Sequence, residues 1–372
     1  MKSLKAELVI EKKTGRVRQA GASSAEGEWI AQMKAEAEKN LFFFGFTILG
    51  LTRLTSSLHL PVCKWLTSFP GYRKLLLLPR DHLKTSILRA LALHIFIQAA
   101  GANPYFPGKS GSSLRILYAG ETATNAEHQL AWLEGQLEKN ELLRAFWPQI
   151  AWEKPSRDSK RWNSQEMLLP RDEDFPEASV ETIGVGGAVT GRHYDILMKD
   201  DLISMAARKS QVIMQDAILW HKTSRALLDN PETGLEFTIG THWAVSDLYT
   251  EMRTSDPSVE CLVRAAIEDG QPIFPEMFSL KVLNAMRVEY GPLFSLIFMN
   301  NPIDTGLVDF DLSGVRMWEK TPGGLFSFET SPLDEQISYL LSQAISLPEP
   351  ERGAVISPRE LLRFSREGRL SI

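Results

Sequence analysis

The chain has 372 residues, more than one average domain and enough to bury a large core. Hydrophobic residues make up 44% of it and charged residues 23%, which is ordinary for a globular protein. The formal net charge of -5 argues against a strongly basic, constitutive nucleic-acid binder but leaves room for a local basic groove.

Two further features exclude other protein classes. Cys63 and Cys261 lie far apart in apolar sequence, which predicts buried thiols in a reducing cytosol and not a disulfide framework or a metal site. The longest apolar run, LFFFGFTILGL over residues 41–51, is too short to span a bilayer and too far from the N-terminus for a signal peptide. We therefore expect a core helix there and no membrane partner.

The first predicted segment, residues 1–27, is a polar arm in which Lys and Arg outnumber Glu. A helical pattern follows from about Glu28 to Leu66, and a second helix is predicted over 124–139. Apolar strands are predicted at residues 74–78, 114–120, 194–199 and 234–240. Strands that alternate with helices predict an α/β fold, a mainly parallel sheet flanked by helices, within one domain over residues 28–305.

Two regions break this rhythm. Residues 148–191 contain Pro, Gly and Trp with little helical period, and predict a β-rich insertion. Residues 306–372 predict a linker and a short irregular tail, with one candidate helix over residues 332–347.

Residues 79–86, PRDHLKTS, join the strand at 74–78 to a helix. In a phosphate-binding loop, backbone N–H groups and the positive end of a helix dipole converge on phosphate oxygens, while Lys neutralises charge and Ser or Thr binds Mg²⁺. Aligned on Lys84-Thr85, the pattern G-x-x-x-x-G-K-[ST] has Leu78 and Leu83 at its glycine positions, so the plain motif is not met. An exposed lysine near a helix start explains Lys84-Thr85 equally well.

The strand YDILMK (194–199) ends in Asp200 and Asp201. Asp200 is placed to hold Mg²⁺, and Asp201 to orient or deprotonate an attacking water. Glu121, after the strand at 114–120, is the alternative base if Asp201 does not act as one. Neighbouring carboxylates repel, so a nearby cation is a natural compensation, although a polar loop after a buried strand is the alternative. Both halves are expected at the carboxyl edge of one sheet, with the unit at 114–139 between them.

Thr241 follows the strand at 234–240 and is placed to sense a γ-phosphate. A turn that leads into a helix capped by Ser246 would account for the same residues, and both can hold together.

Five segments in order carry a resemblance: PRDHLKTS, VGGAVTGRHYDILMKDDLIS, TIGTHWAVSDLY, PIFPEMFS and GPLFSLIFMNNP. Together they resemble the large terminase subunit of tailed bacteriophages, from about His59 to Phe310. That family packages viral DNA into preformed heads with a RecA-like P-loop ATPase, and it tolerates a Walker A loop that has an Arg and lacks both glycines.

The resemblance implies ATP and Mg²⁺ as cofactors and gives each motif residue a role. Lys84 and Arg80 match the Walker A residues that act on the phosphates, and Asp201 stands where many relatives have a catalytic Glu or Asp. Thr85 and Asp200 match the metal site, and Thr241 the coupling motif. The implied nucleotide-binding residues are Pro79, Arg80, Asp81, His82, Leu83, Lys84, Thr85 and Ser86. Arg192, Arg208 and Arg225 are candidates for an arginine that acts in trans.

The resemblance also implies double-stranded DNA, a portal protein and a small terminase subunit as partners. It implies a homo-oligomeric ring on the portal, in the host cytoplasm and transiently at the procapsid, and absence from the mature virion. Large terminases continue into an RNase H-like nuclease that needs several carboxylates on two metals. Since Asp334 is the only Asp after Asp311, we expect no nuclease activity in this chain, and a separately encoded nuclease would be a further partner.

Two alternatives stay open at this point. One is another RecA-like translocase or helicase ATPase, which is expected to show the motifs of a second RecA-like domain. The other is a truncated terminase remnant that folds but has no motor activity of its own.

Overall fold

A computed structural model of the chain describes residues 24–69, 71–188, 191–302, 318–321 and 324–327. The predicted polar arm, apart from its last four residues, lies outside these residues, as do most of the predicted tail and its candidate helix at 332–347. The chain divides into two compact units, residues 1–302 and 303–372. In the second unit an antiparallel hairpin is described, β10 (Trp318–Thr321) with β11 (Gly324–Ser327), where an irregular tail was predicted.

The N-terminal helical region is divided into shorter helices. They are α1 (Ser24–Lys39), α2 (Leu41–Phe43), the π-helix η1 (Phe44–Ile48) and α3 (His59–Leu66). Asn40 has an extended backbone that ends α1, and its side chain accepts a hydrogen bond from the Phe43 amide at 3.1 Å to cap α2. Leu41, Phe44 and Ile48 are buried, so the apolar run at 41–51 lies in the core as predicted.

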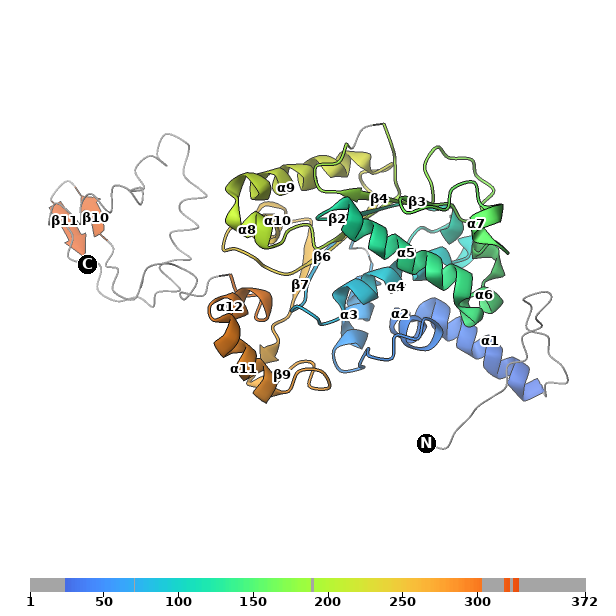
Figure 1. Cartoon of the computed structure of the whole chain (residues 1–372), viewed down its shortest axis with the longest axis horizontal. Coiled ribbons are helices and arrows are strands. Elements are labelled where there is room, and N and C mark those ends of the chain that lie inside the picture. Colours follow the sequence, from blue (N-terminus) through green and yellow to red (C-terminus); the bar gives the residue numbers. More distant parts are fainter. Residues whose placement is uncertain (1–23, 70, 189–190, 303–317, 322–323, 328–372) are drawn as a thin grey trace. The chain divides into compact units, whose positions relative to one another are not determined.

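One sheet organises the first unit (Figure 1). Its strands are β1 (Arg73–Leu77), β2 (Ile116–Gly120), β3 (Glu166–Met167), β4 (Val180–Gly184), β5 (Ile196–Asp200), β6 (Leu235–Gly240) and β7 (Glu260–Val263). Within the described residues their order is β3-β4-β2-β5-β6-β1-β7, and each neighbouring pair except β3–β4 is parallel. The predicted fold class, an α/β fold with a mainly parallel sheet flanked by helices, is confirmed.

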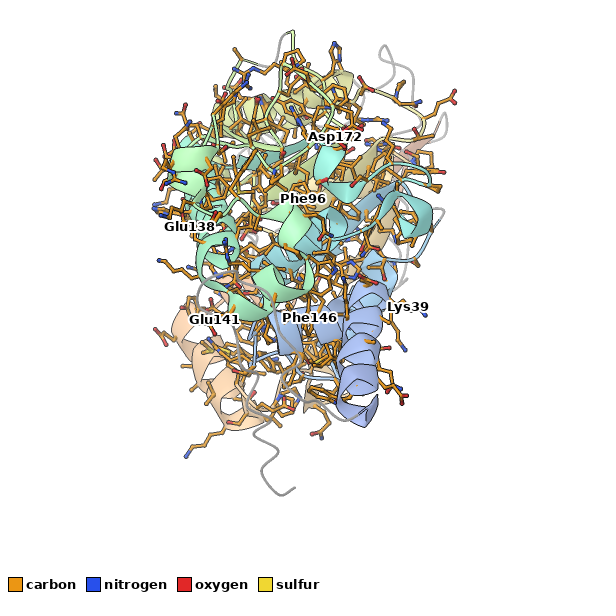
Figure 2. All side chains as sticks on the ribbon, turned by 90° about the vertical axis from the view of Figure 1, so that its right-hand side faces the viewer. Lys39, Phe96, Glu138, Glu141, Phe146 and Asp172 are labelled. Atoms are coloured by element: carbon orange, nitrogen blue, oxygen red, sulfur yellow. The ribbon has the colours of Figure 1, made fainter. Side chains whose placement is uncertain are left out.

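Helices cover both faces of this sheet. Leu76 and Leu78 pack with α4 (Lys84–Phe96), α5 (Ala123–Lys139) and the N-terminal helices on one face. Leu75 and Leu77 pack on the other face with α8 (Met205–Lys209), α9 (Gln211–Ser224) and α10 (Leu248–Ser255). In Figure 2, Phe96 lies among the packed helices whereas Lys39 and Glu138 lie at the periphery. No helix in the described parts of the chain is long and apolar enough to cross a membrane.

The first unit contains further described helices and strands. They are η2 (Ala100–Ala102), η3 (Gly111–Ser113), α6 (Glu141–Phe146), η4 (Pro148–Ile150), α7 (Pro155–Asp158), η5 (Arg225–Leu227), β8 (Ile267–Glu268), β9 (Gln271–Pro272), α11 (Leu280–Tyr290) and α12 (Leu293–Ile297).

The region 148–191 differs from the predicted β-rich insertion. Its strand β4 belongs to the main sheet and runs parallel to β2, with Ile116 opposite Val180 and Gly120 opposite Gly184. The rest of the described region holds short helices and the two-residue strand β3. Glu181 obscured this strand in the sequence, because its buried carboxylate accepts hydrogen bonds from Tyr194 and Arg192 and so tolerates a core position.

Two further predictions need correction. The unit at 114–139 lies between the two halves of the site in chain order only: in space β6 lies between β1 and β5, while β2 is on the far side of β5. Cys63 is buried as predicted, but Cys261 is exposed, because it lies on the edge strand β7.

Glu236 on β6 joins the three strands that lead into the predicted site. Its carboxylate accepts from Lys199 of β5 at 2.6 Å and from Arg73 of β1 at 3.0 Å, and all three side chains are buried. Burial alone would raise the pKa of Glu236, but the positive charges of Lys199 and Arg73 outweigh it and lower that pKa from 4.5 to about 2. The carboxylate therefore stays ionised inside the sheet.

We predict that Glu236→Gln destabilises the protein by about 3–5 kcal/mol, because it leaves Lys199 buried without a counter-charge and removes one of the two carboxylates that pair with Arg73. The lowered pKa means that the native contribution is present above pH 4.5 and is lost as the pH falls toward about 2. Denaturant unfolding at pH 7 measures the change. Glu251→Gln is the control, since the Lys222–Glu251 pair is partly exposed and should contribute less than about 1 kcal/mol. Equal destabilisation by the two variants would contradict the prediction.

Candidate active site

The loop between β1 and α4 has the shape of a phosphate-binding loop without its glycines. Asp81 and Leu83 both have a left-handed backbone, with φ of 62° and 61°. Leu83, at the position of the motif's second glycine, precedes the first residue of α4 directly. No side chain caps α4, so the amides of its first turn are open to an anion at the positive end of the helix.

His82 is the loop residue that does not face the site. Its ring is fully buried, stacks on Phe278 at 5.0 Å between centroids, and contacts the edge of Phe274. Nδ1 lies 2.9 Å from the Arg80 carbonyl oxygen, and burial lowers the pKa of His82 to about 4, so the ring is neutral at pH 7. His82 therefore anchors the loop to the protein, although the resemblance grouped it with the nucleotide-binding residues.

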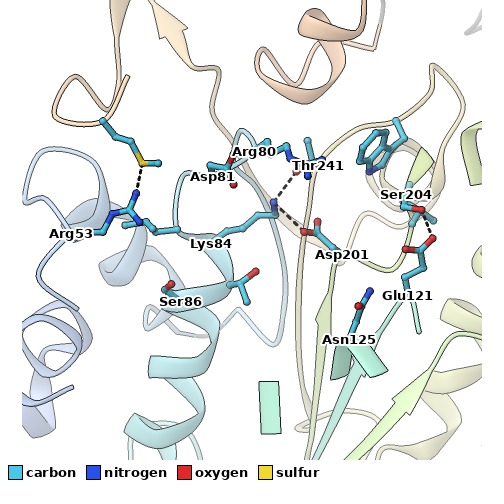
Figure 3. Close-up of a pocket in the computed structure, with 15 residues that line it drawn as sticks. Arg53, Arg80, Asp81, Lys84, Ser86, Glu121, Asn125, Asp201, Ser204 and Thr241 are labelled. Carbon is cyan, nitrogen blue, oxygen red and sulfur yellow. Dashed lines mark hydrogen bonds and ion pairs between the residues drawn. The ribbon is translucent and has the colours of Figure 1, made fainter. Parts of the chain in front are cut away.

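The two predicted halves of the site meet across the sheet edge. The Thr85 hydroxyl donates to Asp200 Oδ1 at 3.0 Å, and the buried Lys84 amine lies 3.2 Å from Asp201 Oδ2. Lys84 also donates to Thr241 Oγ1 at 2.9 Å, so predicted residues that follow three different strands converge (Figure 3).

The carboxylates of Asp200 and Asp201 repel each other, and a bound cation would relieve this repulsion. Burial, and then the charge of Asp201, raises the pKa of Asp200 to about 7. Asp201 also has a positive φ of 45°, and its buried Oδ1 has no hydrogen-bond partner among the described residues. A hydroxyl, an ionisable carboxylate and an unpartnered carboxylate oxygen form a donor set that suits Mg²⁺, which typically takes one or two protein carboxylates together with substrate phosphates.

Thr241 links the site to the segment behind it. The next residue, His242, is buried with its Nδ1 3.1 Å from both carboxylate oxygens of Asp247. Asp247 caps α10 by accepting from the amides of Tyr249 and Thr250, so the helix cap lies one residue after the predicted Ser246. Asp247 caps the helix in place of Ser246 because its carboxylate bonds to both His242 and the helix amides.

A cavity of about 470 Å³ lies over these residues. Its walls include Arg80, Asp81, Leu83, Lys84, Thr85, Ser86, Asp201 and Thr241 from the predicted site, whereas Pro79, His82 and the buried Asp200 do not line it. Glu121, the alternative base, also lines it. Arg53, Asn125 and Ser204 line it too and were not among the predicted site residues. Arg53 had no sequence signal, because it lies in a turn inside a stretch that reads as helical.

The three candidate trans-acting arginines are all held within the chain, and none lines the cavity. Arg192 pairs with Glu181, and Arg225 pairs with Asp256 at 3.2 Å. Arg208 donates to the Trp243 carbonyl oxygen at 2.8 Å and so supports the segment after Thr241. Arg80 and Arg53, by contrast, have no carboxylate partner among the described residues.

With this geometry in place, the chain can be compared with known proteins. No family model and no curated protein matches it. The structure is similar to the HK97 bacteriophage large terminase, with a TM-score of 0.41 and 15% identity over 64% of this chain and 48% of that one. It is also similar to the large terminase of a thermophilic bacteriophage, with a TM-score of 0.37 and 10% identity over 81% of this chain and 76% of that one. Both are phage large terminases. The chain spans about half the length of the HK97 protein.

The left-handed backbone at Asp81 yields a prediction about the loop. Asp81→Gly should leave the free energy of unfolding within about 1 kcal/mol of wild type, because Gly adopts this conformation freely. Asp81→Val should be less stable than Asp81→Gly by about 1–2 kcal/mol, since a β-branched side chain clashes there. Chemical denaturation of both variants measures the difference. Equal stability would show that residue 81 does not need a left-handed backbone.

Proposed function

We propose that this chain hydrolyses ATP with Mg²⁺ and that it serves as the ATPase part of a phage DNA-packaging motor. The contact between Thr85 and Asp200, with Lys84 beside them at the open end of α4, carries the ATPase proposal. A helix N-terminus, a lysine and a hydroxyl–carboxylate pair at the carboxyl edge of a parallel sheet are what a nucleoside triphosphate with its metal requires.

Each residue has a role that follows from its position. The amides at the start of α4 and the Lys84 amine bind phosphate oxygens, and Arg80 adds a charge from the same loop. Thr85 and Asp200 would hold Mg²⁺, which when bound neutralises phosphate charge and favours an in-line geometry. Asp201 accepts a proton from the attacking water, and Thr241, on the far side of Lys84, reports whether the γ-phosphate is present.

Lys84 would allow the site two arrangements. Without phosphate, its amine is shared between Asp201 and Thr241. Phosphate competes for the same amine, so binding would release Asp201 to act as a base and Thr241 to change partner. The proposal thus couples substrate binding to activation of the base, through one ammonium group.

The packaging role rests on the order of the five motif segments and comes with the partners that the family implies. Double-stranded DNA, the portal and the small subunit would act on a ring of this chain. With a net charge of -5, one copy should hold DNA weakly, since affinity rises with the number of phosphates neutralised. Several copies around one duplex would supply the grip through effective concentration.

The proposal is tested by ATP turnover of the purified chain with Mg²⁺, alone, with double-stranded DNA, and with the cognate portal. We expect turnover that DNA or portal stimulates. ATP turnover that responds to neither DNA nor portal would support the ATPase activity but contradict the motor function, and would favour the alternative of a truncated remnant. An absence of nucleotide binding would overturn the whole proposal.

We predict that Lys84→Ala abolishes turnover and weakens nucleotide binding, because helix amides alone cannot neutralise the phosphate charge. Binding of a fluorescent ATP analogue and release of phosphate are the two measurements. Lys222→Ala serves as the matched control, since this lysine is exposed on α9 and pairs with Glu251. A folded Lys84→Ala protein with normal turnover would refute the assignment of the site.

Asp200 and Asp201 should fail in different ways. Asp200→Asn should lose the Mg²⁺ dependence of nucleotide binding, because it removes the charge that faces Thr85. Asp201→Asn should still bind ATP with Mg²⁺ but turn it over about 10²–10⁴-fold more slowly, since it cannot accept the proton. Titration of nucleotide with and without Mg²⁺, alongside single-turnover hydrolysis, separates the two. Wild-type turnover by Asp201→Asn would place the base elsewhere.

A further inference from the structure

Glu121 is a carboxylate in the cavity that the proposed mechanism leaves unused. It follows β2 directly and lines the wall formed by the ends of β2 and α5. One of its oxygens, Oε1, accepts a hydrogen bond from the Ser204 hydroxyl (Figure 3). No cation pairs with it among the described residues, whereas Asp201 is paired with Lys84.

The register of the sheet places Glu121 beside the proposed base. β2 and β5 are parallel neighbours, and Gly120 lies opposite Asp200. Glu121 and Asp201 are therefore each one residue past an aligned pair, on strands about 4.8 Å apart. Both side chains line the same cavity, to which the first turn of α4 is also open.

Ser204 fixes the orientation of Glu121. It follows Asp200-Asp201 by a few residues, and its hydroxyl also accepts from the Ala206 amide at 3.2 Å as the cap of α8. Its proton is donated to Glu121 Oε1, and Oε2 has no hydrogen-bond partner in the part of the chain that the structure describes. A serine that is itself fixed by a helix start holds a carboxylate more firmly than solvent would.

We propose that Glu121 is a second catalytic carboxylate, which accepts one O–H of the attacking water while Asp201 accepts the other, and that Ser204 positions it. This inference rests on the proposed ATP hydrolysis. The water oxygen forms the bond to the γ-phosphorus as the bond from that phosphorus to the β,γ-bridging oxygen breaks. One water proton passes to Asp201, the second stays on the water oxygen and hydrogen-bonds to Glu121, and ADP leaves with the bridging oxygen's electron pair. Holding both protons directs a lone pair of the water at the phosphorus.

The test uses the full chain and three variants. Glu121→Gln keeps an oxygen that can accept from Ser204 but removes the charge, so a merely structural role would tolerate it. Ser204→Ala removes the positioning hydrogen bond. Glu127→Gln, on α5 and outside the cavity, makes the same charge change and is the matched control. Affinity for a fluorescent ATP analogue with Mg²⁺, kcat and KM are measured for each.

We expect Glu121→Gln to bind the analogue like wild type and to lose about 10–10³-fold in kcat with little change in KM. This loss is smaller than the roughly 10²–10⁴-fold expected for the group that accepts the proton. Ser204→Ala should lose less, about 3–10-fold, and should add nothing when combined with Glu121→Gln, because both act through one contact. Glu127→Gln should match wild type. A normal kcat in Glu121→Gln, or an equal loss of kcat in Glu127→Gln, would overturn the catalytic role of Glu121 and leave the proposed ATP hydrolysis standing. A wild-type chain that binds no ATP analogue and turns over no ATP would overturn the proposed function instead.

Discussion

Glu236 ties together, near their amino ends, the three strands whose carboxyl ends carry the site. β1 leads into the phosphate-type loop, β5 into the paired aspartates and β6 into Thr241, and the carboxylate of Glu236 contacts a cation on each of the outer two strands. Hydrogen bonds between strands set spacing but leave sliding and twisting soft, whereas a buried charge without its partner is costly. The two buried ion pairs therefore favour one alignment of the three strands, and the loops of the site follow the carboxyl ends of those strands.

A loop without glycine needs another source of rigidity. Asp81 and Leu83 occupy left-handed conformations that cost non-glycine residues about 1–2 kcal/mol each. His82 between them is buried against Phe274 and Phe278, and the Arg80 amide donates to the Ile297 carbonyl oxygen at 2.9 Å. The strained backbone is thus held in place by the packing of His82 on two phenylalanines that lie more than 190 residues later in the chain. Glycine adopts such a loop conformation at little cost in free energy. In this chain, contacts with distant residues stabilise the conformation instead.

The sequence could predict local structure and which strand ends share an edge of the sheet. Four of the strands, the start of α4 and the meeting of Thr85 with Asp200 follow from apolar runs that end in polar residues, because carboxyl ends of parallel strands share an edge. β4 could not be predicted because Glu181 disguises it, and the position of β6 between β1 and β5 could not because chain order does not give spatial order. The inward turn of His82 and the contact of Glu121 with Ser204 depend on packing partners distant in sequence, so no spacing rule reports them.

The charge on the cavity wall explains why substrate and metal should arrive together. Among the described residues that line it, the cations Arg53, Arg80 and Lys84 face the carboxylates Asp81, Glu121 and Asp201. These charges balance, and Asp200 lies buried just behind them with its pKa raised by burial and by Asp201. A bare triphosphate would meet the helix N-terminus and also three or four carboxylates, and in a partly desolvated cavity that repulsion is not screened. A divalent cation placed between phosphates and carboxylates converts both repulsions into attractions. The carboxylates of this cavity therefore disfavour the free nucleotide, while its lysine and arginines bind the metal complex. Both effects contribute to selectivity for the metal complex.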